Sequence, residues 1–354
     1  MNKERLEKLC AKGSIKIVEA MEKIDRNAHG ILFIVSEEKK LIGAVTDGDI
    51  RRWLIKTANL ETEIAVLMNH QPKFLYMADR KRATSYMKEK KIHALPLLDS
   101  EMHILDIVLD DEENIVSNSS KILSDVPVII MAGGKGTRLY PYTKILPKPL
   151  IPIGDIPILE RIIHRFCEYG ASQYYMTVNY KKGIIKAHFA EIQPEYSIVY
   201  VEEDKPLGTA GSIKLIEQRF DVPVIVTNCD ILIEADYEDI YNYHKKSGNA
   251  MTIVSALKNI EVPYGVLHSG KNGVVTAMEE KPKLSYFVNT GMYIVNPECL
   301  DKIPRDTFFH MTHLAELLKE EGLQIGMYPI SEESFLDMGE FEEMRRMEEK
   351  LKVK

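Results

Sequence analysis

The apolar residues in the last two-thirds of the chain fall in short runs that alternate with longer amphipathic stretches. Residues 126–132, VPVIIMA, form a continuous apolar run, which is typical of a strand buried on both faces. The pattern predicts a helix at 156–169 and further strands at 173–178, 197–201 and 222–228. This alternation indicates an α/β, Rossmann-like fold with a mainly parallel sheet and helices on both faces. Ligands of such folds bind at the carboxyl ends of the strands.

The first third of the chain has a different pattern, in which a group of helices and strands is repeated. The first copy is predicted as a helix at 15–24, strands at 31–35 and 41–46, and a helix at 49–56. A weaker second copy is predicted as a helix at 83–90 and strands at 94–98 and 103–109. Two tandem units of this size suggest an internal duplication in which each copy buries its apolar face against the other.

A polar stretch at 111–125, DEENIVSNSSKILSD, separates the two patterns and has the composition of a domain linker. We therefore predict a small α/β domain over 1–118, a linker over 119–125 and a second domain over 126–354.

Composition narrows the classes of function. The chain has 354 residues and a net charge of -7, so two domains fit its length and no polybasic field for nucleic acid or an anionic membrane is expected. The cysteines Cys10, Cys167, Cys229 and Cys299 lie far apart, which indicates neither a zinc knuckle nor a disulfide framework. Without an apolar leader or a run of about 18 apolar residues, a cytoplasmic protein with no membrane partner is expected.

A glycine-rich loop follows the first strand of the second domain. It reads Ala132-Gly133-Gly134-Lys135-Gly136-Thr137-Arg138-Leu139. Its glycines let the backbone turn tightly and bring N–H groups against phosphates, and Lys135 and Arg138 add positive charge. The loop is not a Walker A motif, because Gly136 stands where the hydroxyl residue is required, and it is not GxGxxG, because Leu139 occupies the third glycine position.

A second cation follows in Leu146-Pro147-Lys148-Pro149-Leu150, where two prolines stiffen the chain around Lys148. A fixed lysine beside an anion loop implies two phosphates. The combined stretch MAGGKGTRLYPYTKILPKPL resembles the signature GGxGTRLxPxTxxxPKPL of the sugar nucleotidyltransferases. The resemblance to this family extends over about residues 126–345. The resemblance implies a GT-A-like domain that joins a nucleoside triphosphate to a sugar-1-phosphate and releases pyrophosphate.

Carboxylates at two positions suit a metal ion. Asp230 follows the predicted strand 222–228, at the edge of the sheet where a hard cation bridging phosphates would lie. Asp337 stands in Phe335-Leu336-Asp337-Met338-Gly339. The resemblance implies that these two aspartates bind Mg²⁺. Asp230 could alternatively start the next turn.

Three further stretches resemble family motifs. The segment 203–211, EDKPLGTAG, resembles the loop that reads the base and closes on the sugar, which implies nucleotide contacts from Gly208 and Thr209. Met278-Glu279-Glu280-Lys281-Pro282 resembles the EKP element, which implies that Lys281 holds the sugar phosphate and Glu280 the sugar hydroxyls. Asn289-Thr290-Gly291 resembles the stretch that lines the sugar pocket. A lone EKP is usually a solvated turn, whereas the motifs occur here in family order.

These positions imply a mechanism of positioning and charge neutralisation. A sugar phosphate is anionic at neutral pH, so no serine, cysteine or histidine is needed as a nucleophile. Catalytic roles are therefore assigned to Arg138, Lys148 and Lys281. His310 and His313, which could share a helix face, are interpreted as ordinary packing or surface residues, and 341–354 as a charged solvated helix.

The first domain resembles a pair of CBS motifs over about residues 8–115, well in LFIVSEEKKLIGAVTDGDIRRWL and poorly in the second copy, which has LDIVLDDEE. The resemblance implies that Thr46 and Asp49 meet the phosphate and ribose of a regulatory nucleotide. The alternative is that Asp49 caps its helix and Thr46 ends its strand. The pair would either bind that nucleotide or mainly drive assembly into a homo-oligomer.

A CBS pair joined to this transferase resembles the guanylyltransferases that make GDP-glucosamine for legionaminic acid synthesis. That resemblance favours GTP and α-D-glucosamine-1-phosphate as substrates. A mannose- or glucose-1-phosphate enzyme with another base is an alternative, since one sequence does not display base selection. A binding-only nucleotide-sugar sensor is an alternative from another class.

Overall fold

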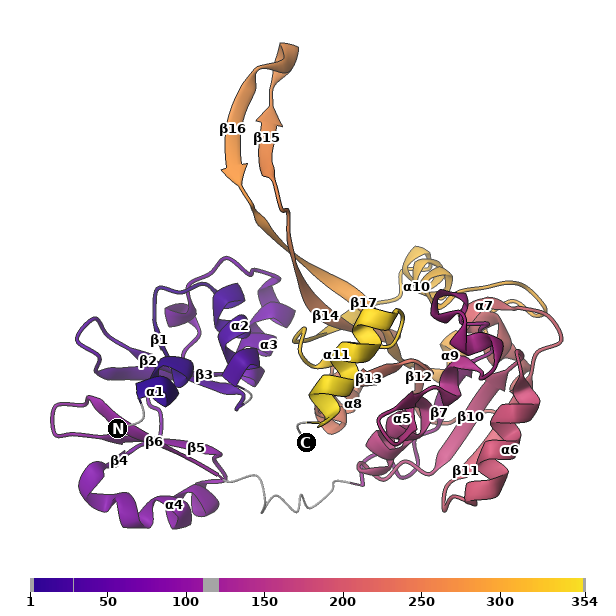
Figure 1. The fold of residues 1–354 in the computed structure, drawn as a ribbon, viewed down its shortest axis with the longest axis horizontal. Coiled ribbons are helices and arrows are strands. Elements are labelled where there is room, and N and C mark those ends of the chain that lie inside the picture. The colour runs from indigo at the N-terminus through magenta and orange to yellow at the C-terminus, as the bar shows by residue number, and fades with distance from the viewer. Residues whose placement is uncertain (1–2, 28, 111–120, 353–354) are drawn as a thin grey trace. The chain divides into compact units, whose positions relative to one another are not determined.

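The computed structural model describes residues 3–27, 29–110 and 121–352, and the chain divides into two compact units (Figure 1). One unit comprises Met1–Val116 and Lys258–Tyr286, and the other comprises Ser117–Leu257 and Phe287–Lys354. Residues 111–120, which include the start of the predicted linker at 119–120, lie outside the described part. None of the helices in the described residues is both long enough and apolar enough to cross a membrane.

The end of the predicted linker, residues 121–125, packs on the second unit. The Leu123 side chain is fully buried in the core of that unit. The N–H group of Leu123 donates to the carbonyl of Tyr169 at 3.0 Å. These residues therefore belong to the second unit, because Leu123 is an apolar side chain in an otherwise polar stretch and is buried with the core.

The first unit contains the repeated pattern. Its elements are α1 (Lys3–Leu9), β1 (Cys10–Lys12), α2 (Ile17–Asn27), β2 (Ile31–Val35), β3 (Leu41–Thr46), α3 (Asp47–Thr57), β4 (Leu75–Tyr76), α4 (Ala83–Lys90), β5 (Ala94–Leu98) and β6 (Ile104–Leu109). The strands form two sheets of the same topology, β1-β2-β3 and β4-β5-β6. In each sheet the first pair of strands is parallel and the second pair is antiparallel.

The two repeats share one apolar core. Phe33 and Ala44 of the first repeat are buried in the same cluster as Leu98 and Ile107 of the second. The backbone also joins them, because the N–H group of Leu41 donates to a carbonyl of the second repeat at 2.9 Å. Each repeat thus covers the apolar face of the other, as expected of units too small to bury that face alone.

A two-stranded hairpin of β15 (Gly265–Ser269) and β16 (Val275–Glu280) completes the first unit. Figure 1 shows that it continues the strands β14 (Met251–Glu261) and β17 (Lys283–Val295). The two strands pair antiparallel with each other, and every residue of β16 is exposed.

The second unit is built on a seven-stranded sheet. Its remaining elements are β7 (Val128–Ala132), β8 (Pro152–Ile153), β9 (Ile156–Pro157), α5 (Ile158–Cys167), β10 (Gln173–Val178), α6 (Lys182–Ile192), β11 (Ser197–Glu202), α7 (Gly208–Gly211), β12 (Val224–Asn228), β13 (Ile231–Ile233), α8 (Tyr237–Ser247), α9 (Pro297–Leu300), α10 (Met311–Glu320), β18 (Ile325–Ile330), β19 (Phe335–Asp337) and α11 (Phe341–Lys352). The strand order is β11-β10-β7-β12-β17-β14-β18. The pairs among β11, β10, β7 and β12 are parallel, which confirms the predicted mainly parallel sheet.

Both faces of this sheet are buried. Along β7, Val128, Ile130 and Ala132 belong to one core, and Ile129 and Met131 belong to another. The first core includes side chains from α5, α6 and α8, and the second includes side chains from α7, α9 and α10. Successive side chains of a strand point to opposite faces, so the continuous apolar run of β7 follows directly from burial on both sides.

The predicted helix at 156–169 begins later and ends earlier. Ile156 and Pro157 form the short strand β9, which pairs with β8. The helix α5 starts at Ile158 with Pro157 at its N-cap. The chain then leaves the helix before Gly170, which has a φ of +90°. Proline is well suited to the start of a helix because it has no N–H to leave unpaired, and glycine often follows its end.

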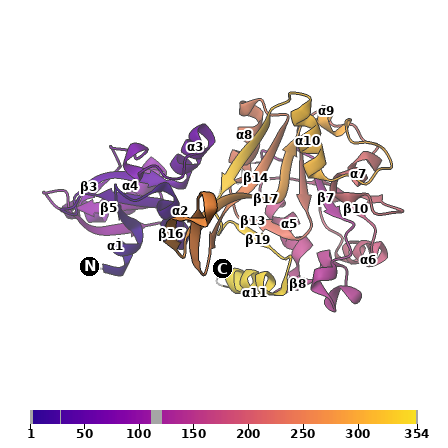
Figure 2. The same cartoon turned by 90° about the horizontal axis from the view of Figure 1, so that it is seen from above.

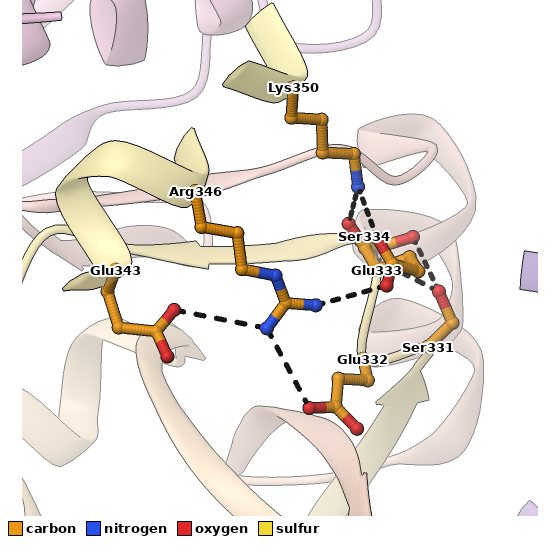
Figure 3. A network of polar contacts seen from close by, with 7 residues as sticks. All are labelled: Ser331, Glu332, Glu333, Ser334, Glu343, Arg346 and Lys350. Carbon is orange, nitrogen blue, oxygen red and sulfur yellow. Dashed lines mark hydrogen bonds and ion pairs between the residues drawn. The ribbon is translucent and has the colours of Figure 1, made fainter. Parts of the chain in front are cut away.

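The C-terminal helix α11 differs from the predicted solvated helix, because one of its faces is packed. Met347 is buried in the core of the second unit. Figure 3 shows the charged contacts beside it: Arg346 lies 3.0 Å from a carboxylate oxygen of Glu333, and Lys350 lies 3.2 Å from the other. Figure 2 shows α11 next to β8. Charged residues dominate the sequence of α11, so the few apolar residues that dock it form no clear pattern.

Candidate active site

The phosphate loop leaves β7 at its carboxyl end and depends on Gly136. This residue has a φ of +63°, in the left-handed region that favours glycine. A Cβ atom there would lie 2.9 Å from Thr143 Cγ2 and 3.1 Å from Lys148 Cβ. The Thr143 hydroxyl also donates to the Gly136 carbonyl at 2.8 Å. Gly136 therefore lets the loop lie directly against the segment that carries the predicted catalytic lysine.

The same loop meets a buried carboxylate at Gly133. A Cβ atom at Gly133 would lie 2.4 Å from Glu203 Oε1. Glu203 follows β11, is buried, and accepts a hydrogen bond from the N–H group of Leu207 at 3.2 Å. Burial raises the pKa of the Glu203 carboxyl, and this hydrogen bond partly opposes the rise. Glu203 thus joins the phosphate loop to the predicted base-reading loop, a role that sequence reasoning missed.

Lys148 is buried and its ammonium group forms an ion pair with Asp230. Pro147 and Pro149 flank it in a short 3-10 helix, Lys148–Leu150. The two prolines fix the backbone, as the sequence predicts, and the long side chain runs from there to the carboxyl end of β12. A buried charge needs a partner, and Asp230 provides it.

The predicted metal ligands lie together. Asp337 pairs with Ile231 across β13 and β19, and the N–H group of Met338 donates to the Asp230 carbonyl at 2.8 Å. Burial raises the pKa of the Asp337 carboxyl, and the charge of Asp230 raises it further, whereas Lys148 and Arg138 oppose the rise. Two carboxylates that destabilise one another in this way fit a divalent cation, which would relieve their repulsion.

A metal ion held here would take several ligands from outside the protein. Within the described residues, 3–27, 29–110 and 121–352, no group of three histidine, cysteine, aspartate or glutamate side chains is placed to hold a metal. Mg²⁺ commonly keeps waters and binds through one or two carboxylates plus substrate phosphates. The pair Asp230 and Asp337 beside the phosphate loop fits that pattern.

The predicted base-reading loop is locked to the segment 307–311, from which sequence reasoning singled out His310 alone, as a packing or surface residue. A Cβ atom at Gly208, where φ is +78°, would lie 2.6 Å from the Phe309 carbonyl oxygen. The N–H group of Met311 donates to the Thr209 hydroxyl at 3.0 Å. His310 is the N-cap of α10, where its N–H group donates to His313 Nδ1 at 3.2 Å. These histidines therefore serve in helix capping and loop packing.

These elements surround a cavity of about 400 Å³ at the carboxyl ends of the parallel strands. Nine predicted site residues line it: Gly133, Gly134, Gly136, Thr137, Arg138, Lys148, Gly208, Thr209 and Asp230. Residues that were not predicted also line it, among them Thr177, Glu203, Asn228 and Phe308. Strands β10, β11 and β12 deliver Thr177, Glu203 and Asn228 at or beyond their ends, as expected for a parallel sheet.

Cys229 also lines this cavity, between Asn228 and Asp230. Burial raises the pKa of its thiol to about 12, and the charge of Asp230 adds to the rise. The thiol therefore stays protonated near neutral pH and is a poor nucleophile. This agrees with a mechanism in which the substrate supplies the attacking oxygen.

The other predicted site residues lie outside the lining of this cavity. Ala132 is the buried last residue of β7, and Lys135 is exposed in the loop. The Thr290 hydroxyl donates to the Val254 carbonyl at 2.8 Å, and the Asn289 amide donates to the Tyr293 hydroxyl at 2.7 Å. Thr290 thus joins β17 to β14, and Asn289 makes a contact within β17.

Glu280 and Lys281 lie in the hairpin of the first unit, and both are exposed. Lys281 has a φ of +47° although a proline follows it. A left-handed lysine before proline is an uncommon conformation, and such conformations concentrate at functional segments.

The first unit has its own cavity, of about 300 Å³, lined by residues of both repeats. Thr46 and Asp49 both line it, and they also form a capping box. The Thr46 N–H and hydroxyl donate to Asp49 Oδ2 at 2.9 and 2.7 Å, and the Asp49 N–H donates to the Thr46 hydroxyl at 3.2 Å. Lys73 and Lys91 give the cavity positive charge. The capping role of the pair is therefore present, in a position that also faces a cavity.

The family model described as nucleotidyl transferase matches residues 127–352, which is more than half of the chain. The chain belongs to the nucleotidyl transferase family. The CBS domain model matches residues 7–56, that is, the first repeat. The weak second copy expected from its sequence has no counterpart in that match, although its sheet has the same topology as the first.

Named relatives of this nucleotidyl transferase are mannose-1-phosphate guanyltransferases. The protein of Debaryomyces hansenii is 33% identical over 184 residues, which cover 49% of this chain and 51% of that protein. The mannose-1-phosphate guanyltransferase 2 of Candida glabrata is 32% identical over 223 residues, covering 60% of this chain and 61% of that protein. The chain thus spans about half the length of the first of these curated relatives. The crystal structure of HddC from Yersinia pseudotuberculosis matches with a TM-score of 0.50 and 25% identity, over 64% of this chain and 99% of that one.

Proposed function

We propose that the protein is a sugar-1-phosphate nucleotidylyltransferase that uses GTP. The observation that carries the proposal is the meeting of Lys148, Asp230 and the phosphate loop in one cavity, with Asp337 paired to Ile231, the residue after Asp230. Membership of the nucleotidyl transferase family supports the reaction class. The names of its relatives support guanine as the base.

The reaction joins two anions, so the site has to place them and neutralise their charge. An oxygen of the sugar phosphate attacks the α-phosphorus of GTP in line. The bond from the α-phosphorus to the bridging oxygen breaks, and pyrophosphate leaves with the electron pair. At an effective dielectric near 20, two unit charges about 4 Å apart repel by roughly 4 kcal/mol, so fixed cations are required.

Each residue of the site then has a defined task. The N–H groups of 133–137 hold the leaving pyrophosphate together with Arg138. Lys148 exchanges its partner Asp230 for the α-phosphate region, and Asp230 and Asp337 are free to hold Mg²⁺. When bound, Mg²⁺ supplies positive charge that stabilises the phosphates in the transition state. Lys281 of the EKP element is assigned to the incoming sugar phosphate.

For the sugar we propose α-D-glucosamine-1-phosphate, which the combination of CBS and transferase domains favours, in a pathway to legionaminic acid. Mannose-1-phosphate is the second candidate, because relatives are named for it. In the same proposal the first unit binds a regulatory purine nucleotide in its cavity near Thr46 and Asp49.

The test is pyrophosphate release by the full chain with Mg²⁺, across GTP, UTP, dTTP, CTP and ATP paired with glucosamine-, mannose-, glucose- and N-acetylglucosamine-1-phosphate. One active pair containing GTP is expected, and EDTA should abolish its activity. Turnover with a pyrimidine nucleotide alone would refute GTP as the substrate. Tight nucleotide binding without turnover in every pair would favour a binding-only sensor.

A further inference from the structure

One aromatic side chain at the cavity has no role in the site described above. Phe308 lines the cavity together with Pro206, Gly208 and Thr209, and its side chain is 57% exposed. Phenylalanine has no polar group to be solvated, so an exposed ring at a binding cavity has apolar surface available for a ligand.

The backbone that carries this ring is firmly held. The N–H group of Phe309 donates to the Leu207 carbonyl at 2.8 Å. The Phe309 carbonyl in turn accepts from the N–H groups of Ala210 and Gly211, at 2.9 and 3.0 Å. Three hydrogen bonds therefore fix the residue next to Phe308 against the predicted base-reading loop, so little backbone entropy remains to be lost when a ligand meets the ring.

The ring itself is oriented by one neighbour. Phe308 and His310 make a T-shaped contact with centroids 4.7 Å apart. The His310 ring is held in turn by Thr209, whose N–H group donates to Nδ1 at 3.4 Å. The contact with His310 orients the Phe308 ring and still leaves more than half of the side chain exposed.

We propose that Phe308 stacks on the nucleobase of the bound nucleotide. The phosphates are assigned to 133–138 and the reacting centre to Lys148 and Asp230, which leaves the base, a flat ring system with apolar faces, to lie beside Pro206 and Gly208. A phenyl ring offers no hydrogen-bonding groups, so Phe308 contributes affinity for the base without selecting guanine. This inference rests on the proposed nucleotide substrate.

Calorimetric titration of the full chain with GTP, and separately with tripolyphosphate, which has no base, tests the proposal. Stacking on an aromatic side chain is worth roughly 1–3 kcal/mol per base, so Phe308→Ala should raise the Kd for GTP about 10- to 100-fold. The Kd for tripolyphosphate should not change. Phe308→Tyr should bind GTP like the wild type, and Phe308→Leu should resemble Phe308→Ala.

A second measurement reports the contact directly and does not need the alanine variant to fold. The chain has one tryptophan, Trp53, so Phe308→Trp adds an indole at the cavity. Stacking of a guanine base should quench its fluorescence in a saturable way, and tripolyphosphate should not. The wild-type titration with GTP gives the contribution of Trp53, which is subtracted.

The outcomes separate this inference from the proposed function. Equal GTP affinity for wild type and Phe308→Ala, with normal turnover, would overturn the stacking role and leave the transferase standing. Equal losses for GTP and tripolyphosphate would overturn it too, because the effect would not involve the base. Base-dependent loss in a protein that never releases pyrophosphate would support the stacking role and refute the transferase.

Discussion

The two candidate sites described above use their charged side chains in opposite ways. In the second unit, burial and the nearby Asp230 raise the pKa of Asp337, so its charge is held at an energetic disadvantage. In the first unit, Asp49 accepts two hydrogen bonds from Thr46 and also pairs with Arg52 at the start of α3. A carboxylate that the fold does not fully compensate, such as Asp337, indicates a site for a charged ligand. A carboxylate that is paired within its own helix, such as Asp49, is explained by the stability of that helix.

Gly136 and Thr46 differ in the same way in the roles that they have in their motifs. Gly136 is required by a left-handed φ and by contact with Lys148, so its role in the site is geometric. Thr46 is explained by helix capping alone, and any ligand would have to share it.

Removing the buried cation should have the largest effect. Lys148→Ala takes away a fixed positive charge at the reacting phosphates, so turnover should fall by about 10²- to 10³-fold. The measurement is steady-state pyrophosphate release under saturating substrates. Lys144→Ala is the matched control, since Lys144 is exposed and lies outside the cavity lining, and it should leave turnover unchanged. Near wild-type turnover in folded Lys148→Ala would contradict the assignment.

Neutralising Asp337 should separate activity from stability. Asp337→Asn should lower Mg²⁺-dependent turnover by about 10²-fold, since it removes a proposed metal ligand. The raised pKa of Asp337 means that the folded state holds its proton more tightly than the unfolded state, so wild-type stability falls as pH rises through that pKa.

Asparagine does not ionise, so the stability of Asp337→Asn does not fall with rising pH in this way. The variant should therefore be more stable than the wild type at pH 7 without metal. The difference in the free energy of unfolding between variant and wild type should disappear below the ordinary aspartate pKa of about 3.9. Urea unfolding at several pH values in EDTA measures this difference. A variant less stable than the wild type at pH 7 would mean that Asp337 is fully compensated in the fold.

Adding a methyl group at Gly136 should destabilise the second unit. Gly136→Ala forces a left-handed φ on alanine and brings its Cβ against Thr143, for a loss of about 1–3 kcal/mol. Gly134→Ala is the control, because no atom lies within 4 Å of its added Cβ. Thermal unfolding should show a lower Tm for Gly136→Ala and an unchanged Tm for Gly134→Ala. Equal shifts in the two variants would show that the loop is not locked at Gly136.

The smallest effect should come from the first unit. Thr46→Ala removes the N-cap of α3 and should cost about 1 kcal/mol of local stability, whereas Thr46→Ser keeps the hydroxyl. Hydrogen exchange of the α3 amides in the full chain is the measurement. Unchanged protection in Thr46→Ala would mean that the threonine is kept for a ligand and not for the cap.

Features carried by contiguous residues could be predicted from the sequence. The strand at 126–132, the glycine loop and the rigid Lys148 are each local, because chain stiffness, φ and apolar patterning act over a few residues. The topology of a parallel sheet then brings the ends of β7 and β12 to one edge, which explains why Lys148 and Asp230 could be expected to act together.

Features created by distant contacts could not be predicted. Glu203 matters because it lies against Gly133, seventy residues away along the chain and two strands across the sheet. Phe308 reaches the cavity because Phe309 binds the 207–211 backbone. The docking of α11 through Met347 was hidden by the charged residues around it.

The most direct test of the proposed reaction follows the phosphorus atoms of GTP. With α-labelled GTP, a sugar-1-phosphate and Mg²⁺, the label should appear in a sugar nucleotide, and with γ-labelled GTP it should appear in pyrophosphate. Both transfers should slow by about 10²- to 10³-fold in Lys148→Ala. Release of γ-label as orthophosphate, or transfer of γ-label to the sugar, would contradict cleavage at the α-phosphorus and with it the function proposed for this cavity.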